Sequence, residues 1–483
     1  MSRIDPRTPV LVGVGRAGGD EEAVALMSEA LQSAALDAGS SSLLGAVERI
    51  AVPQGTWSYP DPGRILAARI GVPGATTYLA QLGISQQTLV NEVLRAISTG
   101  HCDVAVVTGG EARARARRAE MAGTVVTETA QQDAAPDVVM NREDDFMARP
   151  EVAARLTQPV LQYAMIENAL GAALGQSLAE QRTSVAELWE RFNTVARSNP
   201  DAAFPEPRSA AELASSSAKN RPLAFPYNKW HASQWTVDQA AALILCSVEA
   251  ARAHHVPVDR WLFPLVAVDA NFAVSLSRRR HLHRWPSMGV LGRAAAAQIG
   301  RPLEEVEHIE LYSCFPSAVR IQQRELAMPL DGTPTVTGGM AFAGGPFNNF
   351  VYQATAAMVP LLRTDPAALG LVSTVCGLLT KPGLAVWSAT PDGRPPLLSD
   401  LSAEAATATG QVEVVDAHHG PARVATCTVG YSGMDTARTF VLADIEPGRR
   451  CVAWSDAPEL AEAVVSGTLI GSDVGVVGSE IVA

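Results

Sequence analysis

Residues Gly344 to Leu378 read GGPFNNFVYQATAAMVPLLRTDPAALGLVSTVCGL, and this stretch decides the fold. It opens with two glycines and a proline, and apolar residues then recur at three- and four-residue spacing from Phe350 to Met358, as on one face of a helix. Leu369 to Val375 is a short apolar run closed by Cys376 and Gly377, which is typical of a buried strand. The stretch therefore predicts a glycine-started helix followed by a buried strand.

The same plan occurs earlier in the chain. Leu82-Gly83-Ile84-Ser85 precedes a run with apolar residues at helical spacing from Leu89 to Ile97, and Asp103 to Thr108 (DVAVVT) is then an apolar strand before two glycines. Because each copy pairs a glycine-started helix with a buried strand, the sequence predicts two similar α/β halves that face each other.

Two further segments differ in character from these halves. Ser184-Val185-Ala186-Glu187 has capping-box spacing before an amphipathic run, which predicts a helix in an inserted region. After Trp387, short alternating strands such as Ala422 to Thr428 predict a small β module, and a barrel similar to oligonucleotide-binding folds is its expected closure. The module lacks a basic, aromatic-rich face, so we interpret it as structural or as a docking site for a partner.

The chain is long enough for several hydrophobic cores, because single cores stop growing well below 483 residues. The predicted domains are an N-terminal half (residues 1–112 and 229–258), an inserted helical loop domain (113–228), a C-terminal half (259–388) and an additional C-terminal β domain (389–483).

Composition excludes several classes of partner. The net charge of −12 argues against nucleic acid and anionic membranes, which both require a surplus of Lys and Arg. Six widely spaced cysteines without a CxxC pattern predict no metal site and a reducing, cytoplasmic setting, and no apolar run is long enough to span a membrane. Two basic clusters, interpreted as solvated faces, are Arg113, Arg115, Arg117 and Arg118, and Arg278, Arg279 and Arg280.

The order of four short motifs resembles the thiolase superfamily from about Pro9 to Trp387. Trp235 to Ala242 (WTVDQAAA) is similar to the segment that re-enters the first half after the loop domain. Leu311 to Phe315 (LYSCF) resembles an HDCF motif, Gly344 to Pro346 resembles GHP, and Cys376 to Leu378 resembles CxG.

The appended β domain makes the chain most similar to the class called thiolase-like protein type 1, which is related to the sterol-carrier-protein-type thiolases. The resemblance implies an α/β thiolase fold, with two βαβαβαββ halves in five αβαβα layers, an inserted helical loop domain and a small C-terminal β-barrel.

The resemblance also assigns chemistry to positions. A thiolase uses a nucleophilic Cys at a helix N-terminus, the GHP histidine as its base, and the Cys of CxG as acid and base in the condensation step. The nucleophile position falls at Leu82 or within a residue of it, and the first cysteine of the chain is Cys102. The GHP histidine is replaced by Gly345 and the HDCF histidine by Tyr312, whereas Cys376 matches. The candidate catalytic residues are therefore Cys376 and Tyr312.

Each candidate also has a structural interpretation. Ser85 is the hydroxyl nearest to the nucleophile position, but a serine at a helix start is typically an N-cap. Cys314 is interpreted as a small buried hydrophobe and His231 as structural. Tyr312 either donates a hydrogen bond to a thioester oxygen or fills the space of the missing histidine, and Cys376 without a base should stay protonated.

We therefore expect an acyl-CoA-related, thiolase-like protein without classical thiolase activity, of the kind that family naming would call an acetyl-CoA acetyltransferase. One alternative is a thiolase-like aldolase, a lyase that acts on a hydroxyacyl-CoA through Tyr312. Another is a non-catalytic protein that binds an acyl-CoA or a partner. No cofactor is expected apart from acyl-CoA as substrate or ligand, and the chain is expected to be a monomer or a homodimer that binds neither membrane nor nucleic acid.

Overall fold

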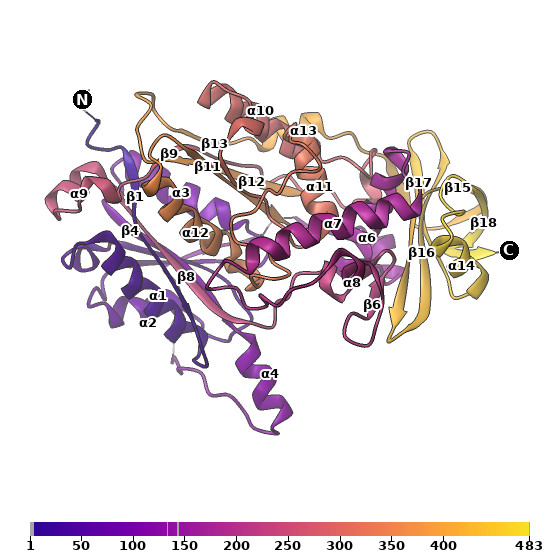
Figure 1. Ribbon diagram of the computed structural model, residues 1–483, viewed down its shortest axis with the longest axis horizontal. Coiled ribbons are helices and arrows are strands. Elements are labelled where there is room, and N and C mark those ends of the chain that lie inside the picture. The colour runs from indigo at the N-terminus through magenta and orange to yellow at the C-terminus, as the bar shows by residue number, and fades with distance from the viewer. Residues whose placement is uncertain (1–3, 133, 143, 483) are drawn as a thin grey trace.

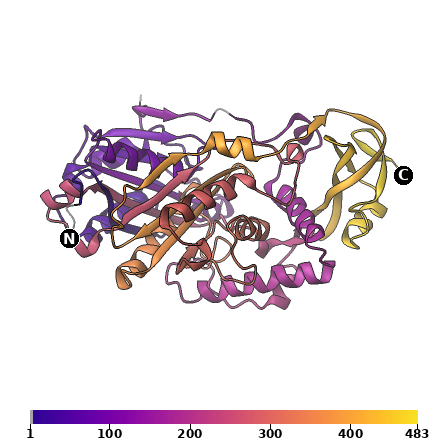
Figure 2. The same ribbon diagram turned by 90° about the horizontal axis from the view of Figure 1, so that it is seen from above.

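The computed structural model describes residues 4–132, 134–142 and 144–482. Its main body stacks helices on two sheets, and the C-terminal strands form a module at one end (Figure 1). Figure 2 shows that the N-terminal sheet and this module lie at opposite ends of the molecule. The predicted domain ranges also include residues 1–3, 133, 143 and 483, which lie outside the described part of the chain.

The first half is built on one sheet, in the order β1–β8–β4–β2–β3–β5. Its strands are β1 (Pro9–Gly18), β2 (Arg49–Pro53), β3 (Thr76–Ala80), β4 (Val104–Ala112), β5 (Val138–Met140) and β8 (Asp238–Ser247). Helices α1 (Ala23–Ala38) and α2 (Pro62–Arg69) pack on its outer face, and α9 (Val248–Ala253) follows β8. β8 is the predicted return strand, and it pairs antiparallel with both β1 and β4.

The second half repeats this plan, in the order β10–β11–β12–β9–β13. Its strands are β9 (Phe263–Asp269), β10 (His308–Glu310), β11 (Leu369–Cys376), β12 (Lys381–Ser388) and β13 (Leu397–Asp400), and α10 (Pro286–Ile299) covers the outer face. The run β9–β12–β11–β10 has the same sequence of antiparallel, antiparallel and parallel pairs as β1–β8–β4–β2. The predicted internal repeat is therefore confirmed.

The two glycine-started helices form the layer between the sheets. They are α3 (Gln86–Ser98) and α12 (Phe350–Thr364), which contact each other and the sheets on either side. α12 begins later than the glycines suggest, because residues Phe347–Asn349 form a short 3-10 turn first. With α10 and α13 (Ser402–Ala408) outside the second sheet, the body has the five αβαβα layers of the thiolase fold.

The inserted region is largely helical, as predicted, and its helix α4 projects from the body away from α6, α7 and α8 (Figure 1). It contains α4 (Arg113–Met121), α5 (Arg149–Ala153), α6 (Pro159–Ala173), α7 (Leu178–Ala196) and α8 (Ala210–Ala214), with the short strands β6 (Pro222–Ala224) and β7 (Tyr227–Asn228). The capping box predicted at Ser184 is wrong. α7 starts earlier, because Ser177 and Glu180 cap it reciprocally, and the Ser184 hydroxyl bonds to a carbonyl within the helix.

A buried ion pair fastens the inserted region to the second half. Glu167 of α6 accepts a charged hydrogen bond from Arg320 of α11 (Pro316–Glu325), and both side chains are almost fully buried. The Tyr227 hydroxyl donates to the second oxygen of Glu167 at 2.8 Å, and Gln176 accepts from Arg320 at 2.8 Å. The charges are thus compensated inside the protein.

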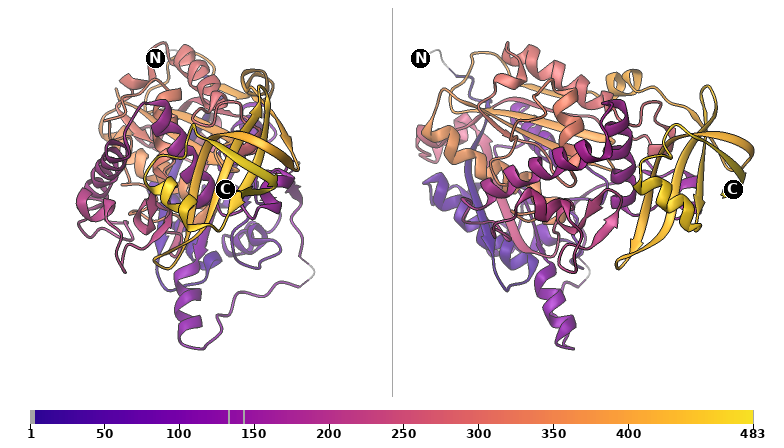
Figure 3. Two further views of the ribbon diagram at one scale, coloured as in Figure 1. Left: turned by 90° about the vertical axis from the view of Figure 1, so that its right-hand side faces the viewer. Right: turned by 45° about the vertical axis from the view of Figure 1, so that its right-hand side comes forward.

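The C-terminal module closes into a five-stranded barrel, as expected. Its pairings run in a ring, β15–β16–β17–β19–β18 and back to β15. The elements are β14 (Glu413–Val415), β15 (His418–Ser432), β16 (Asp435–Glu446), β17 (Arg449–Ser455), α14 (Pro458–Val465), β18 (Asp473–Gly478) and β19 (Glu480–Val482). The barrel strands face the viewer in the left view of Figure 3. The module also has a small apolar core of its own.

Hydrogen bonds attach the barrel to the body. β6 of the inserted region pairs with β15, where Ala224 lies opposite Gly430. Asn168 of α6 donates to the Cys427 carbonyl at 2.9 Å, and the Thr426 hydroxyl donates to Met165 O at 2.6 Å. The barrel is therefore continuous with the inserted region through both backbone and side-chain bonds.

Candidate active site

The two candidate catalytic residues come from adjacent strands of the second sheet. Tyr312 follows β10 and Cys376 ends β11. The Tyr312 backbone N–H donates to Ser373 Oγ at 2.9 Å, and its ring lies edge-on to Phe350, the first residue of α12, at 5.7 Å between centroids. Strand pairing and helix packing thus place Tyr312 beside the inner end of α12.

Electrostatics show that Tyr312 and Cys376 lie close enough to influence each other. Burial raises the pKa of Tyr312, and the neighbouring Cys314 and Cys376 raise it further. Burial also raises the pKa of Cys376 to about 11, although Lys381 and Arg142 lower it. Both groups are therefore neutral at physiological pH, with the phenol as a hydrogen-bond donor and the thiol as a poor nucleophile.

At Gly83, next to Leu82 at the position expected for the nucleophile, an added side chain would meet side chains of the inserted region. Leu82 is 41% exposed and points to the surface, whereas Gly83 lies at the inner side with φ of 100°. A Cβ at Gly83 would lie 2.5 Å from Arg142 Cδ and 2.9 Å from the ring of Phe146. These distances are shorter than van der Waals contact, so side chains from the inserted region occupy the space of the nucleophile.

Phe146 reaches the other side of the site as well. A Cβ at Gly377, next to Cys376, would lie 2.3 Å from the Phe146 ring. Lys381 and Arg142 approach the same ring at 5.4 and 5.1 Å from its centroid, which is cation–π distance. Lys381 Nζ also pairs with Asp144 at 3.3 Å. Below, the Phe146 plug denotes Arg142, Asp144 and Phe146, which lie beside Cys376 and leave it partly exposed.

The position of the missing base is filled in a similar way. A Cβ at Gly345 would lie 2.0 Å from Ser233 Oγ, and the Ser233 backbone N–H donates to Cys314 O at 2.9 Å. A Cβ at the neighbouring Gly344 would lie 2.4 Å from Gln239 Oε1. A histidine at Gly345 would therefore require the Ser233 side chain to move.

The remaining candidates have structural surroundings. Ser85 is the N-cap residue of α3, as predicted, but its buried hydroxyl does not cap the helix and has no partner among the described residues. His231 is buried, which lowers its pKa to about 3, and its Nδ1 accepts from the Asn228 N–H. Burial raises the pKa of Cys314 to about 12. None of the three is poised for proton transfer near neutral pH.

The two arginine clusters behave differently. On α4, Arg118 pairs with Asp20 and Asp238, and Arg117 pairs with Glu120, so this cluster is a solvated, ion-paired face as expected. The expectation is wrong for Arg279, which is only 5% exposed. The short 3-10 turn Leu276–Arg278 directs Arg279 inward, and a run of three arginines gives no signal of which one is buried.

Sequence reasoning missed Phe146 and Ser233, which fill the two degenerate positions. The one available signal for Phe146 is that it is a lone aromatic residue in an acidic, otherwise polar stretch. Among the described residues, no group of three or more His, Cys, Asp or Glu side chains could hold a metal ion. Within the same part of the chain, no helix combines the length and apolar character needed to cross a bilayer.

Comparison with solved structures identifies the fold. A monomeric SCP2-thiolase-like protein type 1 from Mycobacterium smegmatis is similar over 98% of both chains, with 28% identity and a TM-score of 0.83. The Ltp2–ChsH2(DUF35) aldolase and human mitochondrial 3-ketoacyl-CoA thiolase each align with 80% of this chain and 100% of theirs, at 17% identity, with TM-scores of 0.61 and 0.58. No protein-family model and no curated protein matches the chain.

Proposed function

Because the chain is related to the thiolase superfamily and has its fold, we propose that it is a thiolase-like protein that binds an acyl-CoA or related thioester without performing the thiolase reaction. The observation that carries this proposal is the filling of Gly83 and Gly345 by side chains of other segments. A site that had lost only its reactive groups would leave empty space at these positions. In this chain, side chains of other segments lie at the two positions where a thiolase has its nucleophile and its base.

The surviving thiol supports the same conclusion. Acyl transfer requires a thiolate that attacks the thioester carbonyl and a base that removes the thiol proton. With its pKa raised to about 11, Cys376 is ionised in on the order of one molecule in ten thousand at pH 7. Of its cationic neighbours, Lys381 pairs with Asp144 at 3.3 Å and Arg142 with Asp145 at 3.9 Å. Both cations also approach the Phe146 ring.

Ligand binding at this site requires movement of the plug. A human mitochondrial 3-ketoacyl-CoA thiolase of the same fold has been solved in complex with CoA, with a TM-score of 0.56. In this chain, a thioester could reach Tyr312 and Cys376 only after Phe146 leaves the space between Gly83 and Gly377. We therefore expect weak acyl-CoA binding that strengthens when the ring is removed.

Isothermal titration tests the proposal directly. CoA, acetyl-CoA and a longer acyl-CoA are titrated into the wild-type protein and into Phe146→Ala, with Leu36→Ala, an exposed site on α1, as control. We expect at least one acyl-CoA to bind, and to bind about tenfold more tightly to Phe146→Ala only. If neither protein binds any of the three ligands, the acyl-CoA proposal is wrong. If the wild-type protein catalyses thiolysis, the proposal that it does not perform the thiolase reaction is wrong.

A lyase activity is the second candidate, and Tyr312 is the observation that favours it. Its buried phenol lies near Cys376 and stays protonated, so it can donate a hydrogen bond to a carbonyl oxygen. An aldolase assembled with a DUF35 protein shares the fold. This candidate predicts that a hydroxyacyl-CoA is cleaved into a carbonyl compound and a shorter acyl-CoA. The reaction should be lost in Tyr312→Phe and retained in Cys376→Ala, and its absence in the wild type excludes a lyase.

We further propose that the chain is a monomer in a reducing compartment such as the cytoplasm. β5 pairs with Tyr78, Leu79 and Ala80 on the outer side of β3, so most of this edge of the first sheet is paired within the chain. All six cysteines are free thiols, which suits a reducing compartment. The similar protein from Mycobacterium smegmatis is described as monomeric.

A further inference from the structure

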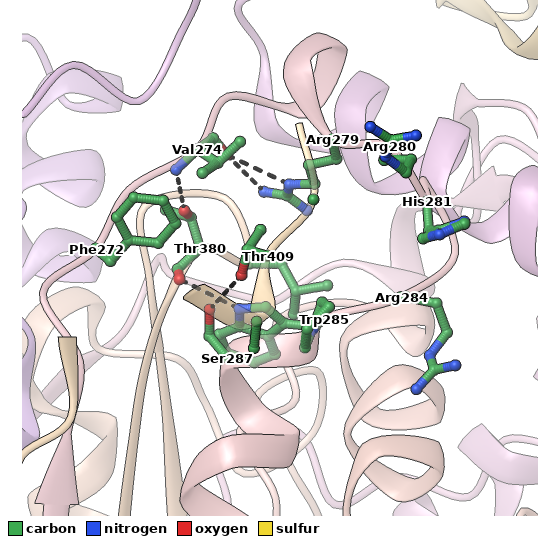
Figure 4. A pocket seen from close by; sticks show the side chains of 14 residues that line it. Phe272, Val274, Arg279, Arg280, His281, Arg284, Trp285, Ser287, Thr380 and Thr409 are labelled. Atoms are coloured by element: carbon green, nitrogen blue, oxygen red, sulfur yellow. Dashed lines mark hydrogen bonds between the residues drawn. The ribbon is translucent and has the colours of Figure 1, made fainter. Parts of the chain in front are cut away.

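A cavity of about 230 Å³ lies beside the loop that follows Cys376 (Figure 4). Its wall comes from the loop between β9 and α10, the first turn of α10, Leu379 and Thr380, and the residues after α13. Four basic side chains line it, Arg279, Arg280, His281 and Arg284, and none of the described residues in its lining is acidic. This is unusual in a chain of net charge −12.

Arg279 is the buried charge of this pocket. Its Nε and Nη2 donate to Val274 O at 3.3 and 3.4 Å, and Nη2 also donates to Leu378 O at 2.6 Å. Its Nη1 has no partner among the described residues. Burial lowers the pKa of Arg279 only to about 10, so the side chain stays charged at neutral pH.

Glu151, the acidic residue that attracts Arg279, already accepts hydrogen bonds from the backbone. Its two oxygens accept the backbone N–H groups of Ser277 and Ala148. No described carboxylate forms an ion pair with Arg279. A buried cation without an anionic partner is unfavourable, and an anion in the cavity would compensate it.

The opposite wall supplies one further backbone donor. α10 begins at Pro286, which has no N–H, and the N–H groups of Met288 and Gly289 donate to Trp285 O, so the Ser287 N–H remains for a ligand. The Thr409 hydroxyl donates to Ala405 O at 2.7 Å and lies 3.2 Å from the Ser287 hydroxyl, and Figure 4 shows Ser287 directed toward Thr409. The Ser287 N–H and the unpartnered Nη1 of Arg279 belong to different elements that line one cavity, and both favour an anion.

We propose that this pocket binds a phosphate group, either free or carried by a small organic ligand. The donors lie on separate elements around the cavity, which suits a tetrahedral group with several oxygens better than a planar carboxylate. Arg280 and His281 are exposed, and Arg280 adds positive charge, whereas Arg284 is bound to Glu325 at 2.6 Å. Phe272 and Trp285 give the cavity an apolar side for an attached organic part.

The C-terminal barrel contacts the backbone of the pocket. Arg450 of β17 donates to the Arg279 carbonyl at 2.7 Å, and the Arg280 N–H donates to Gly410 O at 3.0 Å. The pocket thus lies where the body meets the module, and it is separate from the space filled by Phe146. It extends beyond the proposed function, because it requires neither plug movement nor a thioester.

Titration calorimetry with inorganic phosphate at low ionic strength tests the site. We expect saturable binding to the wild type, weakened about three- to tenfold in Arg280→Gln and in Thr409→Val. Arg117→Gln, which removes the same charge from the remote α4, should bind like the wild type. Arg279→Gln should abolish binding. Should that variant fail to fold, Arg280→Gln and Thr409→Val still decide the question.

Three results would overturn the proposal: no saturable phosphate binding to the wild type, unchanged binding in both pocket variants, or equally tight binding of acetate. Phosphate binding should not change in Phe146→Ala, so this test can fail or succeed independently of the acyl-CoA titration. Competition between phosphate and CoA would show that the group is carried by a nucleotide-containing ligand. Phosphate binding that CoA does not displace would indicate free phosphate or another phosphorylated molecule.

Discussion

Phe146 is the residue on which the chemistry of the site depends, because it closes the space between Gly83 and Gly377. Its ring is held by contacts with Arg142 and Lys381 rather than by a deep apolar core. The Phe146 plug lies beside Cys376, which remains partly exposed. The reactivity of the thiol therefore reports directly on whether the plug is closed.

Phe146→Ala should make Cys376 react about tenfold faster with a thiol-specific reagent, because the ring no longer covers the sulfur. The rate is measured by absorbance in the folded protein. The double variant Phe146→Ala with Cys376→Ala corrects for the other five cysteines. An unchanged rate would mean that Phe146 does not control access to Cys376.

Glu310 gives a prediction on pH. It is buried beside Thr335 and Thr337, and burial raises its pKa to about 7 from 4.5, although four hydrogen-bond donors lower it. Between these pH values the folded state binds more protons than the unfolded state. The free energy of unfolding should therefore fall by about 3 kcal/mol as pH rises from 4.5 to 7, and then level off.

Urea unfolding at pH 5 and pH 8 measures this effect in the wild type and in Glu310→Gln. Other groups titrate in both proteins, so the relevant quantity is the difference between their pH dependences. Wild-type stability should fall more steeply with pH than that of the variant. Parallel curves would show that Glu310 keeps an ordinary pKa in the fold.

At the scale of elements, α6 and α11 are coupled by the buried pair of Glu167 and Arg320. Glu167→Gln leaves the guanidinium in the interior without its counter-charge and should destabilise the protein by about 3–5 kcal/mol in denaturant unfolding. Arg320→Met in the same chain removes the orphaned charge and should restore part of the loss. Equal destabilisation in the single and double variants would exclude this explanation.

The repeated elements could be predicted from the sequence because their signals are local. The glycine starts and helical spacing before Leu89 and Phe350, and the apolar runs of β4 and β11, belong to contiguous segments. β5 has only three residues and is defined by its pairing with β3. β13 likewise depends on β9. Short strands of this kind follow from the tertiary fold and carry no periodic pattern of their own.

The candidate site could be predicted only in part, for a similar reason. The order of motifs led to Tyr312 and Cys376, which the fold brings together. The side chains that fill the vacated space, Phe146 and Ser233, come from segments far away in sequence and match no motif. The burial of Arg279 among three consecutive arginines is also a consequence of packing.

At the scale of the whole molecule, β5 should keep the protein monomeric. Light scattering of the wild type should give a mass near 50.8 kDa. Val139→Pro removes a backbone donor within β5 and should detach it, which exposes the edge of β3 and promotes self-association. Val125→Pro, at an exposed position outside the strands, is the matched control. A wild-type mass twice as large would contradict this interpretation.

The pairing of β6 with β15 sets the timing of folding during synthesis. Ala224 emerges from the ribosome roughly 200 residues before Gly430, its partner. At a synthesis rate of about 5–20 residues per second, Gly430 is made on the order of 10–40 s after Ala224. During that interval the inserted region exposes groups that β15 later covers, so nascent chains should be prone to capture by chaperones. Slow translation of residues 225–430 should then lower the yield of native protein.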